Sequence, residues 1–324
     1  MSSGPWKLRL ELDRRAVNAG EPLTGCVVLD LERPAVVRQL VVEAAGREVL
    51  GAAPHYGPAV YRRVLPRPWG RARTGSKRLD YQVGLPLAGP ATALPAGRHH
   101  FPFRLVLPRE ALPTYGGLGV VVEHEVVARL DLDGERATAW QPLHLWQAER
   151  AAPPPTPAEA SSEAPASGLE RMTERLRAPL VLRLGVDTGA VDLRGALHGW
   201  FELHNPRQSP VRHLVLELLA TETTRHLAAT DINHYVAARR LLPLRREPQV
   251  RESWRWELPV NVAPSLRSPR FRLEWTLVGQ VTLPWALGVT ARLPLELWDS
   301  APGVAKSSDA EKDDAAGREP SAGA

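Results

Sequence analysis

The chain has 324 residues, enough for about two ordinary domains that each bury a core. Its 31 prolines and 25 glycines, against two methionines, favour strands and turns and argue against a helical protein. The net charge is +5, but residues 151–168 and the tail from residue 301 each carry −2, so the remaining residues carry +9 and should prefer anionic surfaces.

The first residues, MSSGPWKLRLELD, contain no apolar core of signal-peptide length. Cys26 is the single cysteine, which excludes an intramolecular disulfide. The longest uncharged run of interest, residues 275–291, is too short and too interrupted to span a bilayer. We therefore expect a protein of the reducing cytoplasm.

Alternating apolar and polar residues mark the expected strands. In residues 6–13, WKLRLELD, every second side chain is apolar, which predicts a strand with one core-facing side. The same period recurs in VVVEHEVVARLDL (120–132) and RFRLEWTLVG (270–279), and turn clusters such as NAGEP and HNPRQSP separate such runs. The sequence predicts an all-β protein built of immunoglobulin-like β-sandwiches.

The second half of the chain repeats the first at a constant offset of 174 residues. Residues 8–43 align with residues 182–217 without a gap, and 14 of the 36 positions are identical. A period of this length indicates a duplicated domain. We predict an N-terminal sandwich in 1–150, a Pro/Ala/Ser-rich tether in 151–170, a C-terminal sandwich in 171–300 and a disordered polar tail in 301–324.

A resemblance follows from the order of these motifs. The first half of the chain resembles the N-terminal half of the arrestin fold. The resemblance rests on the strand at residues 6–13 and, in chain order, on NAGEPLTG, VVLDL, VVRQLVVEAAGRE, LPAGRHHFPFRLVLP and VVVEHEVVARLDL. The stretch from APLVLRLGVD to TARLPLEL resembles its C-terminal half, so the likeness covers most of residues 6–298. That group includes arrestin-domain proteins, retromer subunits and bacterial sporulation-control proteins, which implies an adaptor or scaffold. Residue usage rich in Arg, Ala, Pro and Leu favours a bacterial member.

Two departures narrow what the resemblance implies. The tail contains no PPxY or clathrin-type motif, which argues against the eukaryotic trafficking roles. The buried charged cluster of signalling arrestins is not assigned to particular residues.

The histidines invite a metal or acid–base hypothesis, and strand geometry argues against it. His99 and His100 are neighbours on an expected strand, so they point to opposite faces, and Phe101 and Phe103 share the face of His99. His124 should be a buried, hydrogen-bonded core residue whose flanking glutamates turn away. His226, Asp231 and His234 form the better metal candidate, but nothing in the sequence fixes their geometry, so no metal site is predicted.

No catalytic motif is present: the chain has no nucleophile elbow, phosphate loop, dinucleotide fingerprint or C-x-x-C pair. We predict no enzyme activity and no cofactor. Cys26 should be core-facing or half-buried. Gly25 and Gly199 occupy equivalent places inside strands, which predicts a bulge or a close backbone crossing at both.

The strongest candidate for a binding site in the sequence is the basic stretch VYRRVLPRPWGRARTGSKRL (60–79), which has no acidic residue. It reads either as a loop that binds an acidic or phosphorylated segment or as a solubilising surface. Trp285, in VTLPWALGV, is either an exposed tip or a cover for the core. A second basic run spans residues 238–251. The candidate partner-binding residues are Arg62, Arg63, Arg67, Trp69, Arg71, Arg73, Lys77, Arg78 and Trp285.

The predicted function is a non-enzymatic cytoplasmic adaptor that binds a protein partner through sandwich loops and sheet edges. The alternative is peripheral binding to an anionic membrane through the basic loop and an exposed tryptophan. Nucleic acid is not expected, because no reading motif accompanies the basic residues. The sequence does not predict the partner or the oligomeric state.

Overall fold

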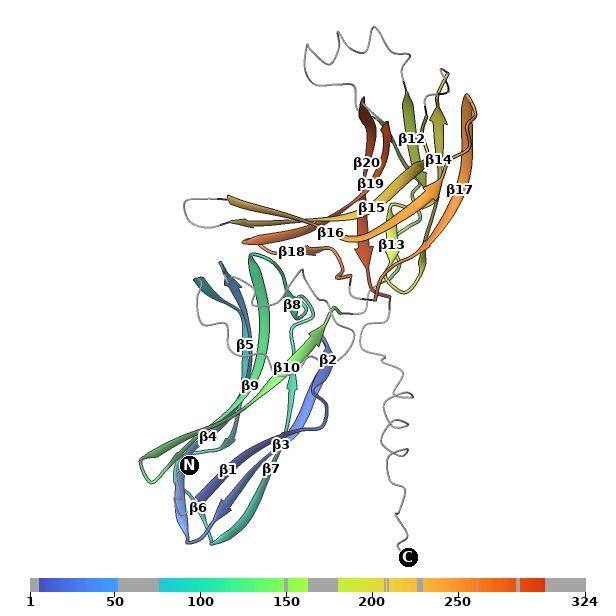
Figure 1. The fold of residues 1–324 in the computed structure, drawn as a ribbon. Coiled ribbons are helices and arrows are strands. Elements are labelled where there is room, and N and C mark those ends of the chain that lie inside the picture. Colours follow the sequence, from blue (N-terminus) through green and yellow to red (C-terminus); the bar gives the residue numbers. More distant parts are fainter. Residues whose placement is uncertain are drawn as a thin grey trace, which may run out of the picture.

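A computed structural model describes residues 6–51, 76–148, 151–162, 180–206, 208, 210–225, 230–260, 262–283 and 286–300. These residues form twenty strands and no helix, arranged as two β-sandwiches (Figure 1). Among them no helix has the length and apolarity needed to cross a membrane. The predicted all-β, two-sandwich fold is confirmed.

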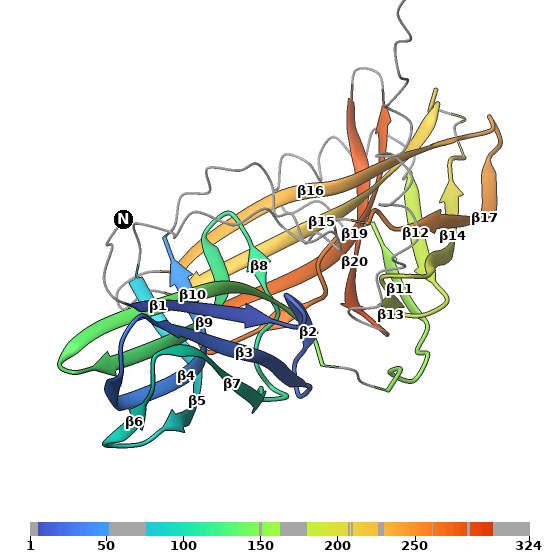
Figure 2. The same cartoon turned by 90° about the horizontal axis from the view of Figure 1, so that it is seen from below.

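The N-terminal sandwich pairs a three-stranded sheet with a seven-stranded sheet (Figures 1 and 2). The smaller sheet has the order β1 (Trp6–Leu12), β3 (Pro22–Leu31), β7 (Gly97–Val106). The main path of the larger sheet is β2 (Ala16–Asn18), β10 (Glu135–Trp146), β9 (Val120–Leu132), β4 (Ala35–Leu50), β5 (Ser76–Ala88). Two short strands join it beside that path, β6 (Thr92–Leu94) on β4 and β8 (Tyr115–Gly116) on β9.

The C-terminal sandwich repeats this plan. Its smaller sheet has the order β11 (Ala158–Ser161), β12 (Val181–Val186), β14 (Ala196–His204), β17 (Gln249–Glu257). Its larger sheet has the order β13 (Ala190–Asp192), β20 (Ala286–Trp298), β19 (Phe271–Leu283), β15 (His213–Arg225), β16 (Thr230–Pro243). The short strand β18 (Leu266–Arg267) pairs with β19.

The topology supports the duplication inferred from the sequence. The order β1-β3-β7 corresponds to β12-β14-β17, and β2-β10-β9-β4-β5 corresponds to β13-β20-β19-β15-β16. Even the unusual parallel pair recurs, since β2 runs parallel to β10 and β13 runs parallel to β20. The aligned segments 8–43 and 182–217 therefore lie in like surroundings.

Each core forms where the apolar faces of the two sheets meet. Along β15, the side chains at every second position from Leu214 to Thr224 are buried, and those between them are half-buried. Because a slip of one residue would turn the whole apolar set to solvent, this alternation fixes the register. Full burial of each leucine contributes about 1.5–3 kcal/mol.

Gly25 and Gly199 each sit where a neighbouring strand leaves no room for a side chain. A Cβ at Gly25 would lie 2.3 Å from the Glu11 carbonyl oxygen and 2.8 Å from the ring of Phe103. A Cβ at Gly199 would lie 2.3 Å from the Gly185 carbonyl oxygen and 2.6 Å from the indole of Trp254. The close backbone approach predicted for both glycines is confirmed, with a carbonyl on one side and an aromatic ring on the other.

Part of the segment expected to be a tether is a strand instead. β11 pairs antiparallel with β12 over four residues, and its Ala158 and Ala160 pack against the C-terminal core. Composition predicted that this stretch could not bury apolar surface. Two alanines are enough here because β12 offers an open edge, and pairing with that edge satisfies the backbone groups of β11.

Candidate functional site

The two sandwiches meet through a shared apolar core. A single cluster of buried residues contains most of the C-terminal core together with six residues of the N-terminal sandwich: Leu50, Leu112, Tyr115, Val120, Val122 and Trp146. The ring of Tyr115 stacks on the ring of Phe271 across the junction, with centroids 6.0 Å apart and an interplanar angle of 2°. The junction is therefore packed like a domain interior.

A buried carboxylate crosses this junction. Glu222 lies on the core-facing side of β15 and is 0% exposed. It accepts hydrogen bonds from the Tyr115 hydroxyl at 2.9 Å, from the Leu118 backbone N–H at 3.1 Å and from the Gly119 backbone N–H. All three donors belong to the N-terminal sandwich, so one side chain of the C-terminal sandwich holds a whole loop of the other.

The sequence TYGGLG (114–119) explains how a loop can wrap a carboxylate so closely. A Cβ at Gly117 would lie 1.7 Å from Oε2 of Glu222, and a Cβ at Gly119 would lie 3.1 Å from Oε1. The absence of a side chain at Gly117 and Gly119 leaves the room in which the backbone N–H groups of Leu118 and Gly119 converge on the carboxylate oxygens. We call Glu222 with residues 115–119 the junction clasp.

Burial and hydrogen bonding act in opposite directions on the clasp. Burial raises the pKa of Glu222, and the hydrogen bonds from Gly119 and Tyr115 partly offset that rise. Burial also raises the pKa of Tyr115 well above its usual value, and nearby Tyr235 and Glu222 add to the increase. The Tyr115 hydroxyl therefore stays protonated and acts as a donor.

Two more carboxyl groups lie near the junction. Burial raises the pKa of Glu48, which is 2% exposed, while a hydrogen bond from Ser268 of the C-terminal sandwich lowers it. Burial also raises the pKa of Asp80, and its bond from the Leu112 backbone N–H, at 3.2 Å, opposes that rise. The charge of Arg78 lowers the pKa of both groups, so this arginine compensates one buried and one half-buried acid.

A pair of histidines is buried within the N-terminal sandwich. His124 and His144 are 4% and 6% exposed, and their ring nitrogens have no hydrogen-bond partner among the described residues. Burial, with a contribution from neighbouring His144, lowers the pKa of His124 to about 3, and burial lowers that of His144 to about 4. The predicted burial of His124 is confirmed, but the predicted hydrogen-bonded ring is wrong, because its surroundings are the Tyr81 ring and aliphatic side chains.

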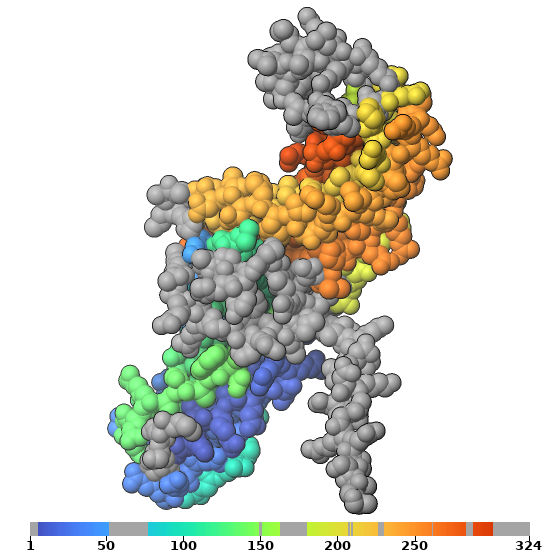
Figure 3. Space-filling model, in the orientation of Figure 1, coloured from blue at the N-terminus to red at the C-terminus, as the bar shows by residue number. Residues whose placement is uncertain are grey.

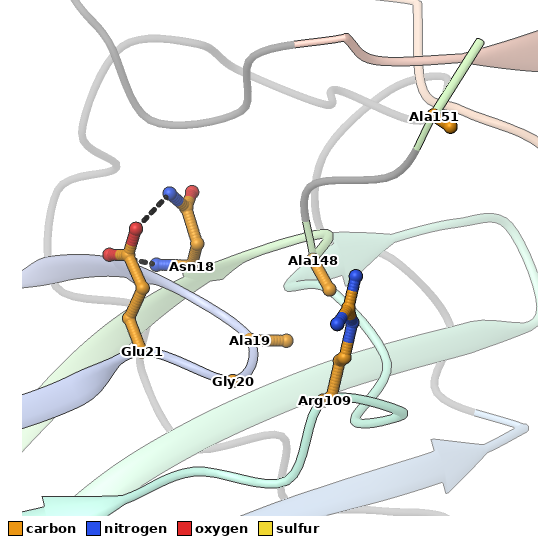
Figure 4. A pocket seen from close by; sticks show the side chains of 7 residues that line it. All are labelled: Asn18, Ala19, Gly20, Glu21, Arg109, Ala148 and Ala151. Carbon is orange, nitrogen blue, oxygen red and sulfur yellow. Dashed lines mark hydrogen bonds between the residues drawn. The ribbon is translucent and has the colours of Figure 1, made fainter.

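Two hollows flank the inner end of the N-terminal sandwich. The first, about 450 Å³, has Glu21 and Arg109 as its charged side chains, and the Glu21 carboxylate is bound by the backbone and side-chain amides of Asn18 at 3.3 and 2.8 Å (Figure 4). The second, about 390 Å³, lies between the sandwiches and is lined by Arg109, Gln147 and Arg267 among others.

Most of the predicted partner-binding residues lie outside the described residues. This applies to Arg62, Arg63, Arg67, Trp69, Arg71, Arg73 and Trp285. Lys77 and Arg78 are described: both are exposed and lie at the start of β5, opposite Val49 and Glu48 of β4. The basic stretch 60–79 therefore runs directly into an edge strand of the larger N-terminal sheet.

Three cations of the second basic run have partners within the C-terminal sandwich. Arg239 donates to Glu217 at 2.7 Å, and Arg240 donates across the sandwich opening to the Arg255 carbonyl oxygen. The guanidinium of Arg251 lies 4.7 Å from the ring centroid of Trp200.

The other candidates occupy strands. His99 and His100 lie on β7, where His99 shares the inward side with Phe101 and Phe103, as predicted. Cys26 is half-buried, as predicted, with its Sγ 3.8 Å from Nδ1 of His100.

The candidate metal ligands His226, Asp231 and His234 do not converge in the described part of the chain. Asp231 and His234 are three residues apart on β16 and so face opposite sides of the strand, while His226 lies outside the described residues. No group of three ligands suited to a metal occurs among the described residues.

Comparison with known proteins gives one informative similarity. The chain is 33% identical over 103 residues to arrestin domain-containing protein 4 of Mus musculus. The match covers 30% of this chain and 23% of the mouse protein, so the chain spans about a quarter of that relative. No family model matches the chain. With the two tandem sandwiches, this similarity gives the chain an arrestin-like fold.

Proposed function

We propose that this protein is a non-enzymatic adaptor that binds a protein partner through the loops and sheet edges of its two sandwiches. The observation that carries the proposal is the pair of sandwiches joined by a packed core and the junction clasp. Such a junction holds two sets of loops and edges on one rigid frame, which suits surface recognition. The similarity to an arrestin domain-containing protein supports an adaptor or scaffold role in general.

The contact proposed for the partner is the basic stretch 60–79. Its arginines offer bidentate hydrogen bonds to carboxylate or phosphate groups, and Trp69 adds an apolar anchor. We expect the partner to present an acidic or phosphorylated segment. Arg78 is left unchanged in the variant that tests this contact, because its charge also compensates Glu48 and Asp80.

The test is affinity capture from native lysate with a charge-reversed variant. Arg62, Arg63, Arg71 and Arg73 are changed to glutamate, and the matched control reverses four exposed arginines elsewhere: Arg33, Arg38, Arg136 and Arg246. We expect the first variant alone to lose a protein retrieved by the parent. Retrieval of the same proteins by all three would refute a role for the basic stretch.

A vesicle assay decides between this proposal and the membrane alternative. Parent protein is sedimented with vesicles of neutral lipid and of neutral lipid mixed with phosphatidylserine. The adaptor proposal predicts no specific sedimentation at physiological salt. Salt-sensitive binding to the anionic vesicles, abolished in the first variant and kept in the control, would replace it with peripheral membrane attachment.

A further inference from the structure

β16 is a long edge strand with an open side. Its fourteen residues pair with β15 on one side, and no described strand pairs with the other. Figure 2 shows β16 as the outermost strand of its sheet. An antiparallel edge strand presents the N–H and C=O groups of every second residue outward, ready to pair with another strand.

The outward face of this strand alternates apolar and polar side chains, with His234 and Arg239 lying between the apolar positions. Ile232, Val236 and Leu241 are 58%, 42% and 58% exposed, and they make up three of the eight large hydrophobic side chains exposed in the described residues. Val236 and Leu241 lie opposite half-buried Leu219 and Val215 of β15. Three exposed apolar side chains therefore lie along the open edge of the β15–β16 hairpin, which lies at the surface of the C-terminal sandwich (Figure 3).

The counterpart of β16 in the N-terminal sandwich is β5, which exposes one large apolar side chain, Leu79, and the edges of the smaller sheets carry charged side chains. β7 carries exposed Arg98, His100 and Arg104 and has Pro102, which lacks an N–H, in its middle. β17 exposes arginines and Glu257 but no large apolar side chain. Such charges and prolines are how natural sheets block edge pairing. β16 differs in exposing three large apolar side chains, Ile232, Val236 and Leu241, beside its open edge.

The charge order of β16 is complementary to itself. Its acid, Asp231, lies near the beginning, and its two arginines, Arg239 and Arg240, lie near the end. When two copies run antiparallel, the beginning of each meets the end of the other. With Ile232 opposite Leu241, both of which face outward, Asp231 of one copy comes diagonally next to Arg240 of the other.

We propose that β16 pairs antiparallel with β16 of a second copy of this chain, joining the two larger C-terminal sheets into one. The bulge at Ala237, opposite Leu218 and Leu219, lies at the two-fold axis, so each side of the axis keeps a regular stretch of strand. The exposed apolar side chains of the two copies then lie on the same face of the joined sheet. This dimer is independent of the partner proposed above.

The first test measures the oligomeric state of the full chain by sedimentation velocity over a wide range of concentration. We expect a reversible dimer. Changing Ile232 and Leu241 together to lysine should raise the dimer dissociation constant at least ~10-fold, because charges would meet at the joined edge. The control changes Val106 and Val260 to lysine, which are 62% and 72% exposed and lie on other segments.

A monomeric parent at its highest soluble concentration would overturn the proposal. So would a dimer that the edge variant and the control affect equally. The urea midpoints of both variants are compared with the parent, since lysines that point into solvent should leave folding unchanged.

The second test probes geometry and does not depend on the lysine variants. In a Cys26→Ser background, Val236→Cys places one thiol beside the two-fold axis, where facing Cα atoms of paired strands are close enough for a disulfide. We expect oxidation to give a covalent dimer, and Val260→Cys in the same background to give none. A dimer that crosslinks at neither position, or at both equally, would contradict edge pairing through β16.

Discussion

Tyr115 of the N-terminal sandwich donates its hydroxyl hydrogen bond to Glu222 of the C-terminal sandwich at 2.9 Å, and the two residues are 1% and 0% exposed. They are 107 positions apart in the chain. A carboxylate placed in such a core is costly unless its oxygens are hydrogen-bonded. The loop 115–119 supplies those bonds, so folding of one sandwich completes the interior of the other.

Removal of the carboxylate should therefore weaken the whole molecule. In Glu222→Ala, the Tyr115 hydroxyl and the N–H groups of Leu118 and Gly119 lose their acceptor inside a water-poor junction. We expect a loss of about 2–4 kcal/mol in the free energy of unfolding, measured by urea denaturation. Glu274→Ala is the control, because that half-exposed carboxylate pairs with Arg272 at the surface and should cost about 0–1 kcal/mol. Equal losses in the two variants would contradict the clasp.

Gly117→Ala tests the junction clasp by changing the loop that binds Glu222. Its Cβ would lie 1.7 Å from Oε2 of Glu222, so the loop must move away and at least one hydrogen bond must break. Gly89→Ala is the matched control, since a Cβ there meets nothing within 4 Å. We expect only Gly117→Ala to lower the melting temperature. Combined with Glu222→Ala, its effect should be clearly less than additive, because both changes remove the same contacts. Full additivity would show that the loop and the carboxylate are independent.

The buried histidines predict a loss of stability in mild acid. Their pKa values, about 3 for His124 and about 4 for His144, lie below the ordinary value of 6.5. As the pH falls below 6.5, the unfolded chain takes up protons that the folded chain does not, so stability decreases until the folded pKa is reached. At pH 5 each histidine should remove about 2 kcal/mol.

The measurement is the difference in pH dependence between variants, because the raised pKa values of Glu222, Glu48 and Asp80 act in the opposite direction. Replacement of His124 or His144 by phenylalanine should flatten the fall of the urea midpoint between about pH 7.5 and pH 5. His213→Phe, at an exposed position, should leave it unchanged. A fall that is equally steep in all three variants would rule out the histidines as its cause.

The alternation of apolar and polar residues was enough to predict an all-β fold, and the repeat at an offset of 174 residues was enough to predict its duplication. Both patterns can be read directly from the sequence, because strand periodicity and turn residues are local properties of the chain. The junction is different. Its contacts join residues more than a hundred positions apart, and no local pattern states which loop meets which strand. A signal was nevertheless present: Glu222 falls at a core position in the alternation of HLVLELLATETTR, where a carboxylate requires an explanation.

Two other differences between prediction and structure have physical causes. Composition marked residues 158–161 as a tether, but the open edge of β12 recruits them into a sheet, and composition does not reveal such an edge. His124 was expected to find a hydrogen bond because buried polar groups normally do. Its strand instead places it beside the Tyr81 ring and close to His144, and burial keeps it neutral. Whether residues 60–75 bind a partner stays a prediction.

Equivalent glycines give a test of the duplication itself. Gly25→Ala and Gly199→Ala would each push a Cβ to 2.3 Å from a carbonyl oxygen of the neighbouring strand, where backbone blocks relaxation. We expect each to cost about 2–4 kcal/mol. Gly84→Ala, whose nearest contact would be an ordinary 3.4 Å from Glu43, should cost far less.

Hydrogen exchange followed by mass spectrometry shows where each glycine variant acts. Gly25→Ala should increase exchange first in β1, β3 and β7, and Gly199→Ala first in β12, β14 and β17, because each glycine closes the smaller sheet of its own sandwich. The junction clasp should then transmit part of the loss to the other sandwich. With Glu222→Ala added, that transmission should decrease, and what remains should pass through the shared apolar core. Exchange that rises uniformly over both sandwiches in every variant would mean that they unfold as a single unit, with no separable role for the clasp.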